Sequence, residues 1–116
     1  MFEESDSRRA SPRVKCGWNV KCVTEQKKVF TARALDVSQG GIQVTSPVAF
    51  KKGDRLYLEI AGYMSGKNHV IKVVGLVVYI SVSTTNEIQI GLKYISNLAL
   101  QDSKFLQQYV KAMLGG

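Results

Sequence analysis

The 116-residue sequence predicts a mainly β fold, a six-stranded antiparallel β-barrel with one C-terminal α-helix packed on its outside. Two observations lead to this prediction. Six segments alternate apolar and polar residues with the period of two that arises when one face of a strand is buried, and turn-forming residues separate them. The final segment changes to helical spacing, with apolar residues at Phe105, Leu106, Tyr109, Val110 and Met113.

The first three predicted strands lie in the N-terminal half. Residues 14–22 alternate without a break, and a polar turn at 24–28 leads to a second strand at 29–35, its hairpin partner. The stretch DVSQGG, residues 36–41, is rich in turn formers and precedes a short third strand at 42–45. The apolar face of the first strand consists of Val14, Cys16, Trp18, Val20 and Cys22.

The fourth and fifth strands are predicted at 55–61 and 70–80, the first after the turn KKGD and the second long and rich in β-branched residues. Between them we expect a loop at 62–68, because this segment contains two glycines. Gly75 lies within the fifth strand, where an isolated glycine is typical of a bulge or a bend.

The sixth strand is predicted at 87–94 and the helix at about 98–114, where two glycines end the helical pattern. Residues 1–13 differ from the rest, because they are polar, mixed in charge and contain one large apolar side chain, Phe2. We therefore expect a mobile leader at 1–13, which does not resemble a secretory signal, and a folded barrel with its helix at 14–116.

The formal net charge of +7 favours an anionic partner, such as a nucleotide, nucleic acid, acidic protein or lipid headgroup, although net charge can also serve solubility alone. The basic residues are spread along the chain. A small basic barrel that binds single-stranded nucleic acid would need exposed aromatic residues, and the alternation assigns Trp18, Phe30 and Tyr94 mostly inward. No apolar run reaches the roughly 18 residues of a membrane helix. We therefore expect neither a nucleic-acid partner nor membrane insertion.

The two cysteines and the single histidine do not suggest catalysis. Cys16 and Cys22 lie in one predicted strand, about 20 Å apart, too far for a disulfide, so we expect free thiols and a reducing, cytoplasmic compartment. His69 falls in an expected loop, without an identifiable nucleophile or carboxylate pair, and we interpret it as a surface histidine. The sequence thus predicts no enzyme, no metal site and no cofactor.

The stretch SRRASPR, residues 7–13, places three arginines directly before the first strand. Arg9 and Arg13 form an RxxxR pattern, and Arg8 precedes it. A guanidinium is a planar fork of donors that fits both phosphates and the edge of guanine. The alternative is a solvated tail.

The stretch DVSQGG carries side chains suited to a purine base. The carboxylate of Asp36 can accept hydrogen bonds from guanine N1–H and its exocyclic amine, and the Ser38 hydroxyl can donate and accept. Gly40 and Gly41 allow positive φ and let a flat ligand approach the backbone. Taken alone, this stretch is also compatible with a plain turn.

The two stretches occur in a set order, with RxxxR upstream of the first strand and DxSxxG after the second. This arrangement resembles the PilZ domain family, bacterial receptors for the second messenger cyclic di-GMP (c-di-GMP). The resemblance covers nearly the whole chain, from about Arg8 to the final helix, and includes the turn at Gly53–Asp54. It implies a six-stranded barrel whose N-terminal loop folds over a ligand on the barrel surface.

The resemblance also implies roles for the motif residues. Arg9 and Arg13 would grip the phosphates and the O6/N7 edges of guanine. Asp36 and Ser38 would hydrogen-bond the base that lies against the barrel, and Gly41 would leave room for it.

An arginine immediately before RxxxR, here Arg8, is typical of family members that bind two mutually intercalated c-di-GMP molecules, so we expect two ligands per chain. The sequence shows no output domain of its own, and we expect the receptor to signal to an unidentified protein through ordering of its N-terminal loop. The sequence leaves two alternatives open: a ligand-independent adaptor with the same fold and, with less support, a small basic barrel that binds single-stranded nucleic acid.

Overall fold

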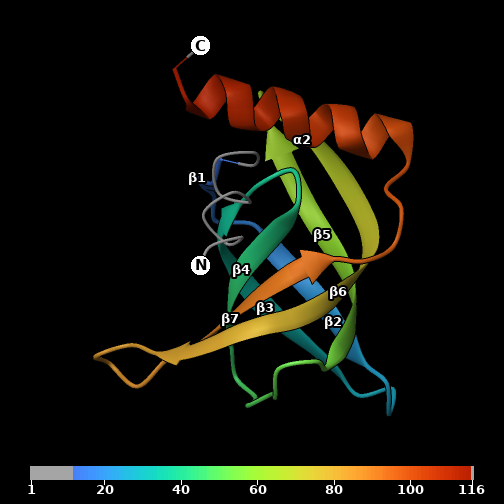
Figure 1. Cartoon of the computed structure of the whole chain (residues 1–116). Helices are drawn as coiled ribbons and strands as arrows, with labels where there is room; N and C mark the ends of the chain where they lie inside the picture. The colour runs from blue at the N-terminus through green and yellow to red at the C-terminus, as the bar shows by residue number, and fades with distance from the viewer. Residues whose placement is uncertain (1–11, 116) are drawn as a thin grey trace.

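The structure is a computed structural model of the chain and describes residues 12–115. Within these residues the chain forms a β-barrel with one helix lying across its upper end in Figure 1. The strands and the helix are β1 (Val14–Lys15), β2 (Asn19–Thr24), β3 (Val29–Val37), β4 (Gly41–Ser46), β5 (Arg55–Met64), β6 (Lys67–Val82), β7 (Ile88–Tyr94) and α2 (Leu100–Met113).

Six strands close the barrel, which confirms the predicted fold. Neighbours are antiparallel in the order β3, β2, β5, β6, β7 and β4, and β4 pairs in turn with β3. The short β1 also pairs with β3, next to β2. Aliphatic side chains fill the interior, and the largest fully buried ones are Leu56, Leu58, Ile60, Ile71, Ile90 and Leu106.

A bulge divides the first predicted strand into β1 and β2. The Cys16 amide donates to the carbonyl of Leu35, and the Trp18 carbonyl accepts from the amide of Ala34. Three residues of one strand therefore face two of the other, and Gly17 is the extra residue. The predicted apolar face is nevertheless inward, with Trp18 buried and Cys16 half-buried.

The predicted loop at 62–68 is wrong, because β5 and β6 continue through this segment as one long hairpin. Their connection is the two-residue turn Ser65–Gly66, in which both residues have positive φ (54° and 80°), as a type I′ turn requires. Gly62 lies within β5, and a Cβ there would stand 2.7 Å from Cε2 of Phe105. This glycine makes room for the helix rather than for a loop.

The bulge expected at Gly75 lies elsewhere in β6. The register between β6 and β7 shifts between Val77 and Tyr79, whereas Gly75 pairs regularly with Leu56 of β5. A Cβ at Gly75 would stand 3.0 Å from Cδ1 of Leu58 in the barrel interior. Gly75 is therefore required by core packing.

The helix covers one end of the barrel with an apolar face, as the helical spacing predicts. The Trp18 ring lies 4.5 Å from the ring of Tyr109 and 5.8 Å from that of Phe105, centroid to centroid. The Tyr109 hydroxyl donates to the carbonyl oxygen of Lys15 at 2.9 Å, which ties the helix to β1. The buried apolar residues of the helix are Phe105, Leu106, Tyr109 and Val110.

His69 also holds the helix, so its interpretation as a surface histidine in a loop is wrong. It lies in β6, its Nε2 is 2.6 Å from Oδ1 of Asp102 in the first turn of α2, and its ring stacks on Phe105 at 4.6 Å. The carboxylate partner comes from a residue 33 positions away, which the local sequence does not reveal.

Candidate functional site

The described parts of the two motifs meet on the outer surface of the barrel. Asp36 lies near the end of β3, paired with Lys15 of β1 on one side and with Gln43 of β4 on the other. Arg13 immediately precedes β1. The fold therefore brings together a carboxylate and a guanidinium that are 23 positions apart in the sequence.

A bulge in β3 turns Asp36 outward. The register between β3 and β4 shifts between Ala34 and Asp36, and both Ala34 and Val37 are buried in the barrel. Without the extra residue the alternation would point Asp36 into the core. The side chain is instead half-buried on the surface.

One carboxylate oxygen of Asp36 has no hydrogen-bond partner among residues 12–115. This oxygen, Oδ1, is buried. Burial raises the pKa of this carboxyl, and the nearby charge of Arg13 opposes that rise. Buried polar atoms are almost always paired, so this oxygen is suited to accept from a ligand donor.

Arg13 stacks on an aromatic ring that the sequence did not single out. Its guanidinium carbon lies 5.7 Å from the ring centroid of Tyr79, and Nη1 donates to the Tyr79 hydroxyl at 3.3 Å. The ring lies flat against Gly91 of β7, where any Cβ would collide with it. Because the β6 bulge sets the direction of Tyr79, periodicity could not have identified this residue.

Ser38 builds the turn between β3 and β4. Its buried Oγ accepts from the amides of Gly40 and Gly41, both at 3.1 Å, and donates to the Gly41 carbonyl at 3.3 Å. A hydroxyl has one donor and two acceptor sites, so all three are occupied. Ser38 positions the turn, and contact with a base would require it to exchange one of these bonds.

The two glycines of the turn are not there for positive φ, which corrects that expectation. Among the described glycines, Gly53, Gly66 and Gly115 have positive φ, and Gly40 and Gly41 do not. A Cβ at Gly41 would instead collide with a backbone carbonyl of β7. This glycine therefore lets β4 approach β7 closely. Beyond this contact, the carbonyl of Gly40 accepts a hydrogen bond from the amide of Tyr94.

A polar row continues this surface across β4, β7 and β6. Nε2 of Gln43 donates to Oε1 of Gln89 at 3.2 Å, and the hydroxyl of Ser81 is 3.5 Å from the same oxygen. These residues come from three strands, and no motif in the sequence points to them.

Both cysteines are free thiols, as expected. Burial raises the pKa of Cys16 to about 11 and that of Cys22 to about 12. Neither is a thiolate at neutral pH, so neither is an activated nucleophile. Residues 12–115 also contain no cluster of three or more histidine, cysteine or acidic side chains that could hold a metal ion. The helix that the structure describes is too short and too polar to cross a membrane.

Arg8 and Arg9 lie outside the described residues, as does most of the predicted leader at 1–13. Their roles as ligand-binding residues therefore stay predictions. Of the RxxxR pair, the structure describes Arg13.

Comparisons with solved structures support the same fold. The inhibitor of motility MotI/DgrA of Bacillus subtilis superimposes with a TM-score of 0.82 at 24% identity, over 93% of this chain and 52% of that one. The PilZ domain of YcgR from Escherichia coli with c-di-GMP has a TM-score of 0.68 at 16% identity, over 91% of both chains. The complex of MrkH from K. pneumonia with c-di-GMP gives 0.67 at 17%, over 92% and 52%. The chain thus spans about half the length of the first and third of these proteins.

No curated protein sequence matches the chain. The family model of the PilZ domain, by contrast, matches residues 7–112 and so includes both motifs. PilZ domains are receptors for c-di-GMP and are generally non-catalytic. The chain belongs to the PilZ domain family.

Proposed function

We propose that this protein is a c-di-GMP receptor that binds its ligand on the outer surface of β3, β4 and β7. The observation that carries the proposal is the buried, unpartnered Oδ1 of Asp36 beside the stacked guanidinium of Arg13. Guanine presents two adjacent donors, N1–H and the exocyclic amine, which a carboxylate can accept together. Support also comes from the YcgR and MrkH structures, which were solved with c-di-GMP.

Each residue of the proposed site has a distinct task. Asp36 accepts from the guanine edge, and Arg9 and Arg13 bind phosphates and the O6/N7 edge of a second base. The ring of Tyr79 keeps Arg13 in place from below, so that the upper face of its guanidinium is available for stacking. Ser38, with the adjacent glycines, holds the turn that brings β3 against β4.

The proposal includes two c-di-GMP molecules per chain, with Arg8 as a third cation. Two ligands bring four phosphate charges and a stack of guanines. A further guanidinium can both neutralise charge and stack on an exposed base.

The proposed output is a change of surface rather than a reaction. We propose that the residues around Arg8 and Arg9 become ordered against the barrel when ligand binds, and that an unidentified protein recognises the new surface. The protein acts as a non-enzymatic receptor in this scheme, and its free cysteines fit a reducing cytoplasm.

Binding of single-stranded nucleic acid receives less support. Trp18 is buried beneath the helix, and Phe30 stacks on Phe50 at 5.6 Å. These rings are unavailable as a platform for successive bases.

Isothermal calorimetry with c-di-GMP tests the proposal, with cyclic di-AMP as the matched control. The two ligands share their phosphates and differ in the base edge that Asp36 would read. We expect binding of c-di-GMP with at least tenfold preference, because adenine lacks the N1–H donor. Equal affinity for both nucleotides, or binding of neither, would refute the proposal.

A further inference from the structure

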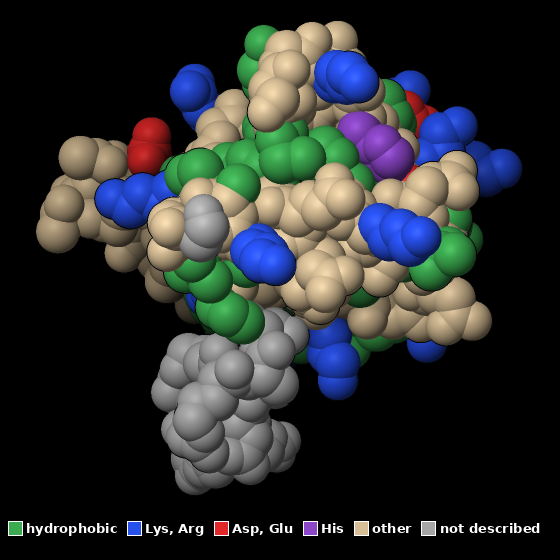
Figure 2. Space-filling model, turned by 90° about the horizontal axis from the view of Figure 1, so that it is seen from above, with side chains coloured by type: hydrophobic (Ala, Val, Ile, Leu, Met, Phe, Trp, Pro, Cys, Tyr) green, Lys and Arg blue, Asp and Glu red, His purple; other side chains and the backbone are tan. Residues whose placement is uncertain are grey.

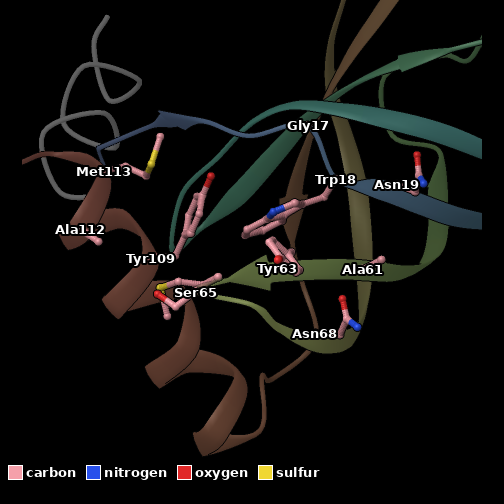
Figure 3. Close-up of a pocket in the computed structure, with 11 residues that line it drawn as sticks. Gly17, Trp18, Asn19, Ala61, Tyr63, Ser65, Asn68, Tyr109, Ala112 and Met113 are labelled. Carbon is pink, nitrogen blue, oxygen red and sulfur yellow. The ribbon is translucent and has the colours of Figure 1, made fainter.

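A groove lies between the helix and the β5–β6 hairpin, away from the motif residues. It has a volume of about 730 Å³. Figure 3 shows Trp18, Tyr63 and Tyr109 gathered in it; Trp18 directly precedes β2, Tyr63 belongs to β5 and Tyr109 to α2. Most of its lining side chains are apolar, and the largest belong to Trp18, Tyr63, Met64, Tyr109 and Met113.

The groove combines a recessed floor with an exposed apolar rim. Trp18 and Tyr109 on its floor are 7% and 9% exposed, whereas Tyr63 and Met113 are 51% and 50% exposed. Leu114, next to Met113, is 59% exposed. In the view from above in Figure 2, hydrophobic side chains form a band across this end of the molecule. Exposed apolar surface concentrated around a concavity marks an interaction site.

The charged residues that flank the groove lining in the sequence are both lysines. None of its lining residues is charged. The charged residues directly next to lining residues in the sequence are Lys67, beside Asn68, and Lys111, beside Ala112, and both are exposed. Figure 2 likewise shows lysine and arginine side chains bordering the hydrophobic band. Carboxylates placed opposite these cations would add electrostatic complementarity.

From this geometry we infer that the groove binds an acidic amphipathic segment of a partner protein. The apolar side chains of such a segment insert over Trp18, and its carboxylates face Lys67 and Lys111. A bilayer is the less suitable partner, because a membrane surface is flat and the aromatic floor is recessed. Tyr63 is the expected main contact, since tyrosine is enriched among the residues that dominate binding energy and a bound segment would cover this exposed ring.

The groove shares a chain segment with the proposed nucleotide site. Gly17 of the groove wall follows Arg13 by four residues, and Tyr109 on the floor donates to the carbonyl of Lys15 between them. A ligand that moves Arg13 would therefore change the groove, and partner affinity would depend on c-di-GMP. This coupling rests on the proposed function, whereas the groove itself does not.

Selection from a displayed library of random peptides of about 16 residues tests the inference on the full-length chain, with and without c-di-GMP. We expect recovered peptides to be net acidic, with apolar residues at i, i+3, i+4 and i+7. In fluorescence anisotropy, Tyr63→Ala should weaken their binding about tenfold or more. Tyr57→Ala is the matched control, because Tyr57 lies on the same strand with 58% exposure and does not line the groove. It should change affinity by no more than about twofold.

A second pair of variants tests the helix side of the groove. Ala112→Glu places a carboxylate in the lining and should weaken binding of acidic peptides, whereas Gln107→Glu adds the same charge to an exposed helix position outside the lining and should not. Equal peptide binding by wild type and Tyr63→Ala, recovery of basic peptides, or a library that yields none would overturn the inference. Binding of phosphatidylserine-containing vesicles in a Tyr63-dependent manner, without peptide binding, would overturn it in favour of a membrane site.

The two proposals fail separately. Calorimetry with c-di-GMP on wild type and Tyr63→Ala reports nucleotide binding alone, and we expect equal affinity in both. Peptide binding without nucleotide binding would support the groove and refute the proposed function. Equal peptide affinity with and without bound c-di-GMP would refute the coupling.

Discussion

Replacing Asp36 by alanine is expected to make the protein more stable and the receptor weaker. The buried Oδ1 has no hydrogen-bond partner within the described chain, and burial raises the pKa of the carboxyl. An unpaired buried polar atom costs about 1–3 kcal/mol. Because Asp36 is half-buried and lies near Arg13, solvent and that charge reduce the cost, so we take the lower limit. The variant should be more stable by about 1 kcal/mol at pH 7.

The raised pKa determines how this difference depends on pH. The folded protein holds the Asp36 proton more tightly than the unfolded chain, where the carboxyl has its ordinary value of 3.8. The cost of the ionised carboxylate is fully present above the folded-state pKa and disappears as the pH falls through it. The difference in free energy of unfolding between variant and wild type should therefore be present at pH 7 and fall toward zero as the pH approaches 3.8.

The expected loss of affinity follows from the hydrogen bonds that the carboxylate would make. Two charge-assisted bonds to guanine, less the cost of desolvating the carboxylate, amount to about 2 kcal/mol, or roughly thirtyfold in Kd. Calorimetry measures this change.

Urea unfolding followed by the fluorescence of Trp18 measures stability, because the chain has one tryptophan and it is buried beneath the helix. A variant less stable than wild type at pH 7 would show that Asp36 supports the fold. Unchanged affinity for c-di-GMP would remove Asp36 from the binding site.

Four further predictions follow from the same surface. Arg9→Ala and Arg13→Ala should each lower c-di-GMP affinity at least about tenfold with thermal stability near wild type, because an arginine outside the core contributes little to folding; calorimetry with unchanged affinity in both variants would exclude the arginine clamp. Arg8→Leu should lower the equivalence point of a titration at high protein concentration from two ligands toward one, and a value of one for wild type would leave Arg8 without a role. Amide exchange across residues 5–13 should slow when c-di-GMP is added, whereas equal protection in both states would place the switch elsewhere. Gly41→Ala should lower the free energy of unfolding by more than about 2 kcal/mol, since its Cβ would collide with a carbonyl of β7; a stability like that of wild type in urea would contradict this packing.

The strands and helix were largely predictable because burial of one face leaves a period in the sequence. Val14, Trp18 and Val20 alternate in the sequence and are buried in the structure. The failures occur where a distant contact decides the role of a residue. Gly62 looks like a loop former, but its missing side chain is what the ring of Phe105 requires.

The motif residues of the candidate site are apparent in the sequence, whereas the residues that position them required the structure. Asp36 could be identified by its position in DxSxxG, yet its outward direction depends on a bulge that periodicity does not reveal. Tyr79 likewise lies beneath Arg13 because a bulge in β6 sets the direction of its side chain, which periodicity does not reveal. The role of Ser38 in holding the turn could not be predicted from the sequence either, because the hydrogen bonds that saturate its hydroxyl form only in the folded turn.

Closure of the barrel restricts the ways in which another chain can join it. Each of the six barrel strands has a neighbour on both sides over part of its length, so along these doubly paired segments there is no free row of amides and carbonyls for strand addition or edge-to-edge aggregation. The two-residue β1 pairs on one side, with β3, and the Tyr109 hydroxyl occupies the carbonyl of Lys15. Recognition along these doubly paired segments must therefore use side chains, and surface residues there can change to fit new partners without altering the backbone hydrogen bonds that hold the barrel closed.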